Sequence, residues 1–265
     1  MKLYDRDYGK LLPAEQAEWE ALLQKEVVNQ VGTMKITRSL YRQYPKAARH
    51  FTELFPNHYL DNVELHEEAR LAKQLAEFEQ LLDKQDATER DILNFVNRER
   101  AYFLIGSLLH AYFPFGHHGV FLFPEFQLGN SYKVDHLIVG QNSSGWHFVF
   151  VELEAPNGKI TIEDGSYGEA FRKGLRQVND WETWLEARYS SITETFEKAL
   201  KVGDVMPQEF RQFDRSRIHY VVVAGRRSDF NDKTYRICRR ERPRLTIHYD
   251  NIVDAARDVI GKTTY

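Results

Sequence analysis

Hydrophobic and polar positions follow two different periods in two parts of the chain. Within residues 1–85 apolar residues recur at helical spacing, and residues 62–84 place Leu75 and Leu82 on one broad face. Residues 12–31 are also rich in good helix formers. A stretch with turn signals lies between them and residues 62–84. The pattern predicts a mostly helical unit over residues 1–85, either a packed cap or an oligomerisation or regulatory domain.

The pattern changes at the segment "KQDATERD". Asp86 followed by Glu89 has the spacing of an aspartate capping box, which predicts a helix start. The helix should continue through residues 90–109, because apolar residues keep helical spacing there. A second unit is therefore expected over residues 86–265.

Beyond that helix the apolar pattern is typical of strands. Residues 119–126 form a strand candidate that should end or bulge at Pro124. Residues 132–140 and 146–154 are separated by turn residues and predict an antiparallel hairpin. The remaining expected elements are a long helix within 166–189, strands at 217–225 and 244–250, and a helix over 251–260. This order predicts an α/β protein with a mixed sheet flanked by helices.

Carboxylates interrupt the predicted hairpin at positions that should be buried. Residues two apart in a strand share a face, so Phe150, Glu152 and Glu154 lie together. Pairing about the turn brings Asp135 near Glu152, at the strand ends away from the turn. Charged side chains are rarely buried unless they are paired or bind a cation.

Converging carboxylates would repel one another unless a cation lay between them. Oxygen ligands suit Mg²⁺ or Mn²⁺, which can generate a nucleophile from bound water and stabilise charge on a phosphoryl oxygen. Phosphodiester hydrolysis requires both effects. The alternative is that the acids mark where a strand emerges into solvent, paired with arginines, and on spacing alone the two interpretations are about equally supported.

Composition narrows the possible classes of protein. The chain of 265 residues is 42% hydrophobic and 28% charged with a net charge of −3, so bulk charge does not indicate a nucleic-acid binder. A single cysteine, Cys238, excludes an intramolecular disulfide framework and a cysteine-rich zinc site. No apolar run of transmembrane length or signal-peptide type occurs, so we expect no membrane partner and a cytosolic location.

Several motifs in order resemble a known family. The segments "PEFQLGNSYKVDHLIVG", "WHFVFVELEAPNGKIT" and "AFRKGLRQVNDWETWL" resemble the catalytic domain of Shedu anti-phage defence proteins, over roughly residues 85–225. That domain has a PD-(D/E)XK restriction-endonuclease-like core. The resemblance implies a Mg²⁺- or Mn²⁺-dependent DNA endonuclease that acts against phage, with an N-terminal helical domain and assembly into a homo-oligomer.

The resemblance also implies roles for individual residues. Asp135 and Glu152 match the metal-binding acids, Gln177 matches a glutamine on the following helix, and Glu89 falls where such nucleases often carry another acid. Glu154 departs from the pattern, because the usual motif has lysine there to steady the transition state. Glutamate could instead be a further ligand or a base. The missing positive charge would then come from Lys159, Lys133 or Lys173, and we favour Lys159.

Each of these residues also has a structural interpretation. Glu89 completes the predicted capping box, and Gln177 could cap a backbone group where mid-helix Gly174 indicates close packing. Trp181 and Trp184 are expected in the core or at a domain interface rather than as platforms for base stacking. The other candidates considered are expected to be solvated or structural, namely His117, His118, His136 and Cys238.

A basic stretch follows the predicted strand at 217–225. Between Arg226 and Arg244 eight Lys or Arg residues face three acids, a local excess of five. Arginine matches phosphate geometry, so the stretch predicts contact with the DNA backbone but no sequence recognition. The alternative is a solvated loop or a set of ion pairs. The predicted DNA contacts are Arg226, Arg227, Arg236, Arg239 and Arg240, with Arg242 in the same run.

The sequence therefore supports two main hypotheses. The first is a metal-dependent DNA endonuclease. The second is a nuclease fold that has lost its chemistry and serves as a DNA-binding or sensor module, for which Glu154 in the lysine position is the main argument. A hydrolase acting on RNA or free nucleotides is a further enzymatic alternative.

Overall fold

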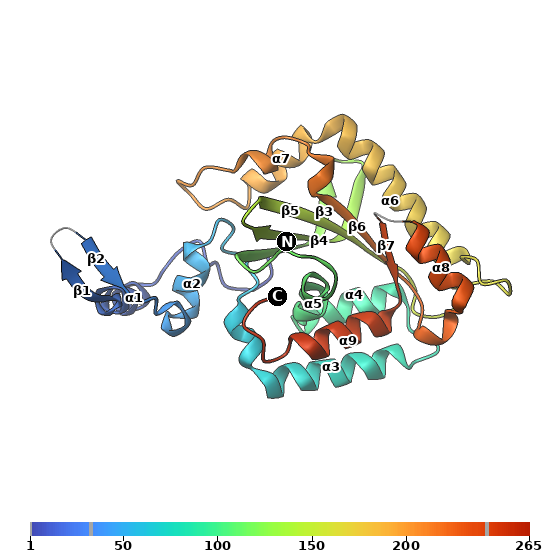
Figure 1. Ribbon diagram of the computed structural model, residues 1–265, viewed down its shortest axis with the longest axis horizontal. Helices are drawn as coiled ribbons and strands as arrows, with labels where there is room; N and C mark the ends of the chain where they lie inside the picture. Colours follow the sequence, from blue (N-terminus) through green and yellow to red (C-terminus); the bar gives the residue numbers. More distant parts are fainter. Residues whose placement is uncertain (1, 32–33, 242–243) are drawn as a thin grey trace.

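A five-stranded mixed sheet organises the fold (Figure 1). The computed structural model describes residues 2–31, 34–241 and 244–265. In spatial order the strands are β3 (Gly119–Leu128), β4 (Tyr132–Asn142), β5 (Gly145–Leu153), β6 (Ile218–Val223) and β7 (Arg244–Ile247). The first three strands are antiparallel and the last three parallel, which confirms the predicted mixed sheet and the predicted hairpin.

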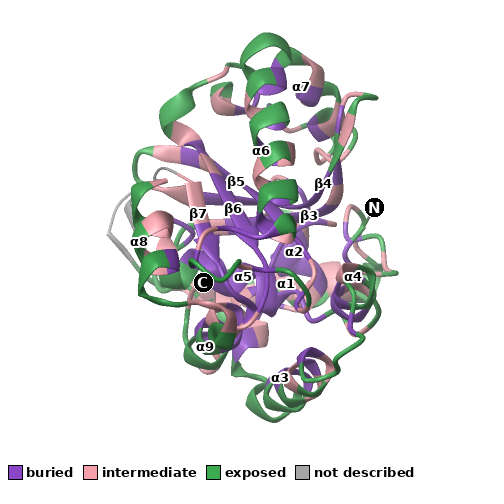
Figure 2. Ribbon diagram, turned by 90° about the vertical axis from the view of Figure 1, so that its right-hand side faces the viewer, coloured by how far each residue is buried: buried purple, intermediate pink, exposed green. Residues whose placement is uncertain are grey.

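Helices cover both faces of this sheet (Figure 1). One face packs against α6 (Glu169–Arg188) and α7 (Ser190–Glu197), which connect β5 to β6. The other face packs against α3 (Glu68–Leu82), α4 (Glu89–Arg98), α5 (Phe103–Tyr112) and α9 (Tyr249–Val259). Between β6 and β7 lies the short helix α8 (Asp232–Arg240). Buried residues are concentrated in the sheet and on the inner sides of the helices (Figure 2).

The alternation along β5 divides its side chains between two cores, as predicted. Phe148 and Phe150 pack in the cluster beneath α6 and α7, while Val151 and Leu153 pack in the cluster beneath α5 and α9. Glu152 therefore lies on the α6 side of the sheet, because it shares the face of Phe150. The sheet presents the acids to α6 rather than to α9.

The N-terminal segment is less uniformly helical than predicted. Here α1 (Pro13–Glu26) ends where valines begin, and β1 (Val27–Val31) pairs with β2 (Met34–Thr37) as an isolated hairpin. β-branched residues favour strands, which explains the change at Val27. Figure 1 shows α1, this hairpin and α2 (Lys46–Thr52) beside the main body. By contrast α3 shares its apolar core with α9, so this part of the predicted unit 1–85 packs directly on the rest of the chain.

The helical segment after residue 85 differs from prediction at two points. Its N-cap is Thr88, whose side chain accepts a hydrogen bond from the backbone N–H of Asp91, so the expected capping box of Asp86 and Glu89 was wrong. The predicted single helix is also broken into α4 and α5. Arg100 adopts a φ of 52°, a left-handed conformation that ends α4 and redirects the chain.

We expected the first strand to end or bulge at Pro124, but it continues past this residue in the same register, with an irregular backbone only at Glu125, whose φ is 50°. Pro124 pairs with His136 and Phe126 with Val134, and β3 reaches Leu128. Proline is tolerated because β3 is an edge strand and its outer side needs no donor at this position. Among the described residues no helix is long and apolar enough to span a bilayer.

Candidate active site

The strand-end acids come together as the hairpin register requires. His136 pairs with Val151, so the next residues outward, Asp135 and Glu152, lie opposite each other. The backbone N–H of Leu153 donates to Asp135 Oδ2 at 2.8 Å, which fixes the first carboxylate against β5. Asp135, Glu152 and Glu154 have exposed fractions of only 9%, 2% and 3%. Three acids are thus buried at one end of the sheet.

Helix α6 covers these acids at a glycine. A Cβ at Gly174 would come within 2.7 Å of a methyl carbon of Val222 and 3.1 Å of Glu154 Cγ. The predicted close approach at this position is therefore to the sheet and to Glu154 itself. A larger residue would push α6 away from the acids.

A lysine from α6 connects two of the acids. Lys173 Nζ lies 2.8 Å from Glu154 Oε2 and 3.1 Å from Glu89 Oε2. Its own side chain is 48% exposed, so it reaches from solvent into the cluster. Helix α6 therefore brings a positive charge to the acid cluster, next to Glu154.

Burial and mutual repulsion disfavour ionisation of the acids. Burial is the main cause that raises the pKa of Glu152 to about 10, followed by repulsion from Asp135 and Glu154. Burial likewise raises the pKa of Asp135 to about 7, although the hydrogen bond from Leu153 opposes the shift. The pKa of Glu154 is raised by burial despite its bond to Lys173. Burial alone would lower the pKa of Lys173, but its bonds to Glu154 and Glu89 raise it.

Two carboxylate oxygens in the cluster have no hydrogen-bond partner in the described part of the chain. They are Glu152 Oε2 and Glu154 Oε1, and both are buried. An unpartnered buried carboxylate oxygen is costly, and an oxygen-seeking cation would relieve that cost. The donor set consists of oxygens alone, which fits Mg²⁺ or Mn²⁺ and not a metal that prefers nitrogen or sulfur.

The remaining predicted site residues differ in whether they contact this acid cluster. Gln177 lies one helical turn after Gly174 on α6, and its buried side-chain oxygen has no hydrogen-bond partner among the residues that the structure describes. Glu89 is the first residue of α4 and contacts Lys173. Lys133 pairs with Glu125 instead. Lys159 forms no ion pair within the described residues, and its predicted role stays a prediction.

Sequence reasoning missed two residues beside the acids. The hydroxyl of Tyr249, at the start of α9, donates to the backbone oxygen of Glu154 at 2.7 Å. Arg176 on α6 lowers the pKa of Glu154 by its charge, although burial outweighs it. Both come from elements distant in sequence, and only the RKGLRQ run on α6 gave a signal for Arg176.

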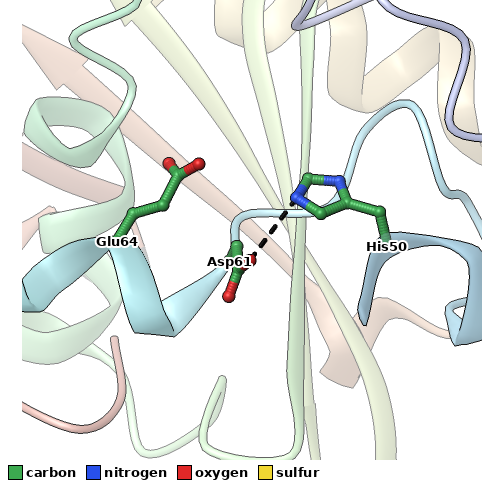
Figure 3. A group of neighbouring side chains, drawn as sticks. All are labelled: His50, Asp61 and Glu64. Atoms are coloured by element: carbon green, nitrogen blue, oxygen red, sulfur yellow. Dashed lines mark ion pairs between the residues drawn. The ribbon is translucent and has the colours of Figure 1, made fainter. Parts of the chain in front are cut away.

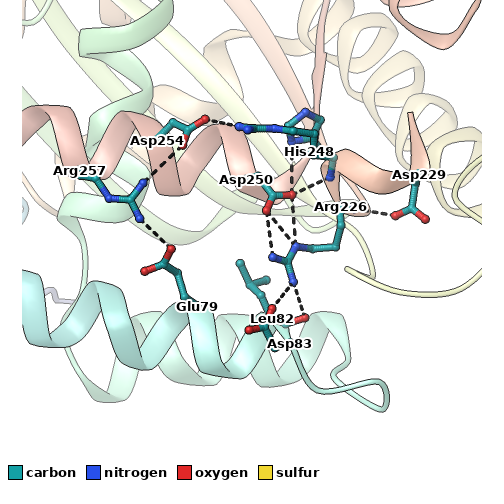
Figure 4. Close-up of polar contacts among 10 residues, drawn as sticks. Glu79, Leu82, Asp83, Arg226, Asp229, His248, Asp250, Asp254 and Arg257 are labelled. Carbon is teal, nitrogen blue, oxygen red and sulfur yellow. Dashed lines mark hydrogen bonds and ion pairs between the residues drawn. The ribbon is translucent and has the colours of Figure 1, made fainter. Parts of the chain in front are cut away.

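The predicted basic stretch divides into two groups. Arg226 is held by Asp250 and Asp83, each at 2.9 Å, and also donates to the backbone oxygen of Leu82 (Figure 4). Arg227 pairs with Asp254. The two arginines therefore join β6 to α3 and α9.

The second group lies on α8. Its side chains are exposed and form no ion pair with a described residue, namely those of Arg236, Arg239 and Arg240. Arg242 lies outside the described residues.

A second buried group of titratable residues lies in the N-terminal segment (Figure 3). His50, Asp61 and Glu64 form the one group of three His, Cys, Asp or Glu residues in the described chain whose ligand atoms all lie within 4.8 Å of one another. Positively charged side chains already pair with both of its acids. Arg49 Nε donates to Asp61 Oδ2 at 2.8 Å, and Lys46 pairs with Glu64.

The other residues considered as candidates lie in the core or on the surface, outside the acid cluster. Trp181 and Trp184 are buried in the core, as predicted. His117 and His118 are exposed in the connection before β3. His136 is fully buried on the sheet face away from Asp135, and burial lowers its pKa to about 4. Cys238 accepts a hydrogen bond from the Tyr167 hydroxyl.

Comparison with known proteins identifies the family. The family model described as "Shedu protein SduA, C-terminal" matches residues 86–253, which include the whole acid cluster and α8. The comparison with curated proteins gave no match. The chain belongs to the Shedu family, and this membership implies a role in anti-phage defence.

Proposed function

We propose that the protein is a metal-dependent DNA endonuclease with a PD-(D/E)XK-type core. One observation carries the proposal: three acids are buried at the end of a hairpin, and two of their oxygens have no hydrogen-bond partner in the described part of the chain. A structural ion-pair network would satisfy those oxygens. The oxygen-only donor set supports a hard divalent cation.

Asp135 and Glu152 would hold Mg²⁺ or Mn²⁺, with Glu154 Oε1 and Glu89 as further oxygen donors. Bound there, the ion would supply positive charge that favours deprotonation of water and stabilises negative charge on a phosphate oxygen. The pKa values of Asp135 and Glu152 are raised, so these carboxyl groups would release their protons when they bind a cation. Gln177 would orient water or substrate through its unpartnered side-chain oxygen.

Lys173 is our choice for the catalytic cation. Its Nζ is held 2.8 Å from Glu154, so Glu154 anchors a lysine where the usual motif would provide one. The half-exposed ammonium group could then contact a phosphate oxygen and stabilise its developing charge. Lys159 is the second candidate, because it follows the acidic strand in the chain.

DNA would be held by positive side chains outside the acid cluster. The exposed arginines of α8 are Arg236, Arg239 and Arg240, and they can contact the phosphate backbone. Arg226 and Arg227 were predicted to do the same, but their acidic partners would have to be displaced first. Foreign DNA as the substrate and a homo-oligomer as the active form are part of the same proposal.

The test is nicking of supercoiled plasmid. We expect nicked and linear products with Mg²⁺ or Mn²⁺ and none with EDTA. The matched variant Asp135→Asn should lose the activity and retain the circular-dichroism spectrum of the parent. Equal nicking by parent and variant, after purification to the same standard, would reject the site.

A binding or sensor module is the second candidate, because Glu154 replaces the usual lysine. Isothermal titration with Mg²⁺ and Mn²⁺ separates the two functions. Absence of ion binding together with absence of nicking on plasmid, single-stranded DNA and RNA would favour the module. Cleavage of RNA alone would indicate a ribonuclease.

A further inference from the structure

The hydroxyl of Tyr249 reaches the acid cluster from the side of the sheet opposite α6. This tyrosine is fully buried at the start of α9, in the core that contains Leu153. Its hydroxyl donates to the backbone oxygen of Glu154 at 2.7 Å. Burial, followed by the charges of Asp135 and Glu89, raises the pKa of Tyr249, in agreement with its place beside the acids. The acid-bearing end of β5 therefore has contacts from both α6 and α9.

Three contacts fix Tyr249 at the start of α9. Its backbone N–H donates to the Gly225 carbonyl oxygen at 2.9 Å, which ties α9 to the end of β6. Arg226 Nη2 donates to Oδ1 of the next residue, Asp250, at 2.9 Å (Figure 4). The Phe78 ring packs edge to face against the Tyr249 ring with a centroid distance of 6.4 Å. The tyrosine ring therefore has one position in the core, and its hydroxyl has one direction.

Tyr249 completes the contacts that hold Glu154. The backbone N–H of Glu154 donates to the Val223 carbonyl oxygen at 2.8 Å, and Lys173 donates to Oε2 of its side chain at 2.8 Å. With the Tyr249 bond on the backbone oxygen, Oε1 is the one polar atom of this residue left without a hydrogen-bond partner in the described part of the chain. A buried carbonyl without a donor is costly, so loss of the Tyr249 bond would let the peptide after Glu154 turn towards another donor. The direction of Oε1 depends on that peptide.

A buried hydroxyl needs an acceptor in any protein, and Tyr189 provides the comparison within this one. Its hydroxyl donates to the backbone oxygen of Glu209 at 2.8 Å. Glu209 lies beside the start of β5, since its side chain accepts from the backbone N–H of Trp146. The two tyrosines thus anchor opposite ends of the same strand. The end at Tyr249 carries the unpartnered carboxylate oxygens of the acid cluster.

We propose that Tyr249 is a positioning residue of the acid cluster, which fixes the end of β5 so that the carboxylates of Glu152 and Glu154 converge on one cation. Tyr249 acts through Glu154 and is not itself a ligand. Removal of a group that orients a metal ligand typically weakens metal affinity or activity by about 10- to 100-fold. The inference rests on the metal site proposed above.

The test compares Tyr249→Phe with Tyr189→Phe, because each substitution removes one buried hydroxyl and keeps the ring. Both variants should melt about 2–5 °C below the parent. In the metal-free proteins, hydrogen–deuterium exchange of the Leu153 and Glu154 amides should be about fivefold faster in Tyr249→Phe and within about twofold of the parent in Tyr189→Phe. Isothermal titration with Mn²⁺ should give a Kd about tenfold weaker for Tyr249→Phe and an unchanged Kd for Tyr189→Phe.

Nicking assays add a readout that a purely structural role would not change. In Tyr249→Phe the Mn²⁺ concentration that gives half the maximal rate should rise about tenfold, while the rate at saturating Mn²⁺ stays within about threefold of the parent. Tyr189→Phe should match the parent in both quantities.

Failure of this inference can be told apart from failure of the proposed function. If the parent binds Mn²⁺ and Tyr249→Phe binds it with the same affinity, the hydroxyl only satisfies a buried carbonyl and the positioning role is rejected. A parent that binds neither Mn²⁺ nor Mg²⁺ rejects the proposed metal site. Exchange at Leu153 and Glu154 then decides alone whether Tyr249 holds the end of the strand, and equal exchange in the two variants would overturn that role.

Discussion

Two groups of buried acids in this protein differ in how their oxygens are satisfied. Asp61 receives Arg49 on one oxygen and the backbone N–H of Val63 on the other. Glu152 is as deeply buried, but one of its oxygens has no partner in the described chain. Both groups lie in a low-dielectric interior, where an unpaired charge is costly.

The difference supports a structural role for the Asp61 group and the proposed metal-binding role for the strand-end acids. The Asp61 group joins α2 to the segment that follows it and leaves no carboxylate oxygen free of a partner. The strand-end acids are neutralised only in part, by Lys173. Proximity of ligand atoms alone would have selected His50, Asp61 and Glu64 as the metal site. Counting partners for each oxygen points instead to Glu152 and Glu154, which lie beside Asp135 in the proposed metal site.

The largest expected effect is on activity at Glu152, where the same substitution should change the stability very little. Glu152→Gln should reduce plasmid nicking by at least about 10²-fold, because a proposed ligand of the ion that stabilises charge on the phosphate is lost. The metal-free variant should melt at the same temperature as the parent or about 2 °C higher at pH 8, since a buried carboxylate is removed. Nicking gels and thermal melts measure the two effects. Glu197→Gln on the exposed surface of α7 is the control, and a Glu152→Gln variant that nicks normally would contradict the comparison.

The structural group should respond in the opposite way. Asp61→Asn removes the charge that neutralises buried Arg49, so the free energy of unfolding should fall by about 3 kcal/mol. Urea denaturation measures the change. Asp204→Asn breaks a surface pair with Lys201 and should cost about 0.5 kcal/mol or less. Equal effects of the two substitutions would show that the Asp61 group is not a buried anchor.

Replacement of Lys173 and of Lys159 tests which lysine stabilises the charge that develops on the phosphate beside the acids. Lys173→Met should lower nicking by about 10- to 100-fold, and Lys173→Arg should restore part of it because the charge is kept. Lys159→Met is the matched control and should stay within about twofold of the parent. The reverse order of effects would assign the role to Lys159, the residue that we favoured from sequence.

The pH dependence of stability gives the smallest expected effect. The folded pKa of Asp135 is about 7, above the unfolded value near 4, so its contribution is fully present below about pH 4 and is lost as the pH rises through 7. The metal-free protein should lose about 1–2 kcal/mol of unfolding free energy between pH 6 and 8 from this cause. Urea titrations across this range measure it. Asp135→Asn should reduce the dependence and leave the part that the raised pKa of Glu152 contributes, whereas an unchanged slope in this variant would show that Asp135 is already ionised in the folded protein.

Much of the site could be predicted because it depends on local periodicity. The hairpin register follows from the turn at residues 141–145, and it places Asp135 opposite Glu152. The family resemblance stated from the motifs is confirmed by the match to residues 86–253. The helix boundaries were less predictable, since Thr88 and Asp86 are both acceptable caps and only the packed structure selects one.

The sequence by itself determined the strands of the main sheet and the faces of their side chains, because side chains alternate with a period of two. Only the tertiary structure decided which cation meets these acids, since Lys173 approaches Glu154 from a helix that crosses the sheet at Gly174. It also decided that Arg226 joins three elements instead of facing solvent. Contacts between elements distant in the chain depend on how the elements pack, and no local pattern encodes that packing.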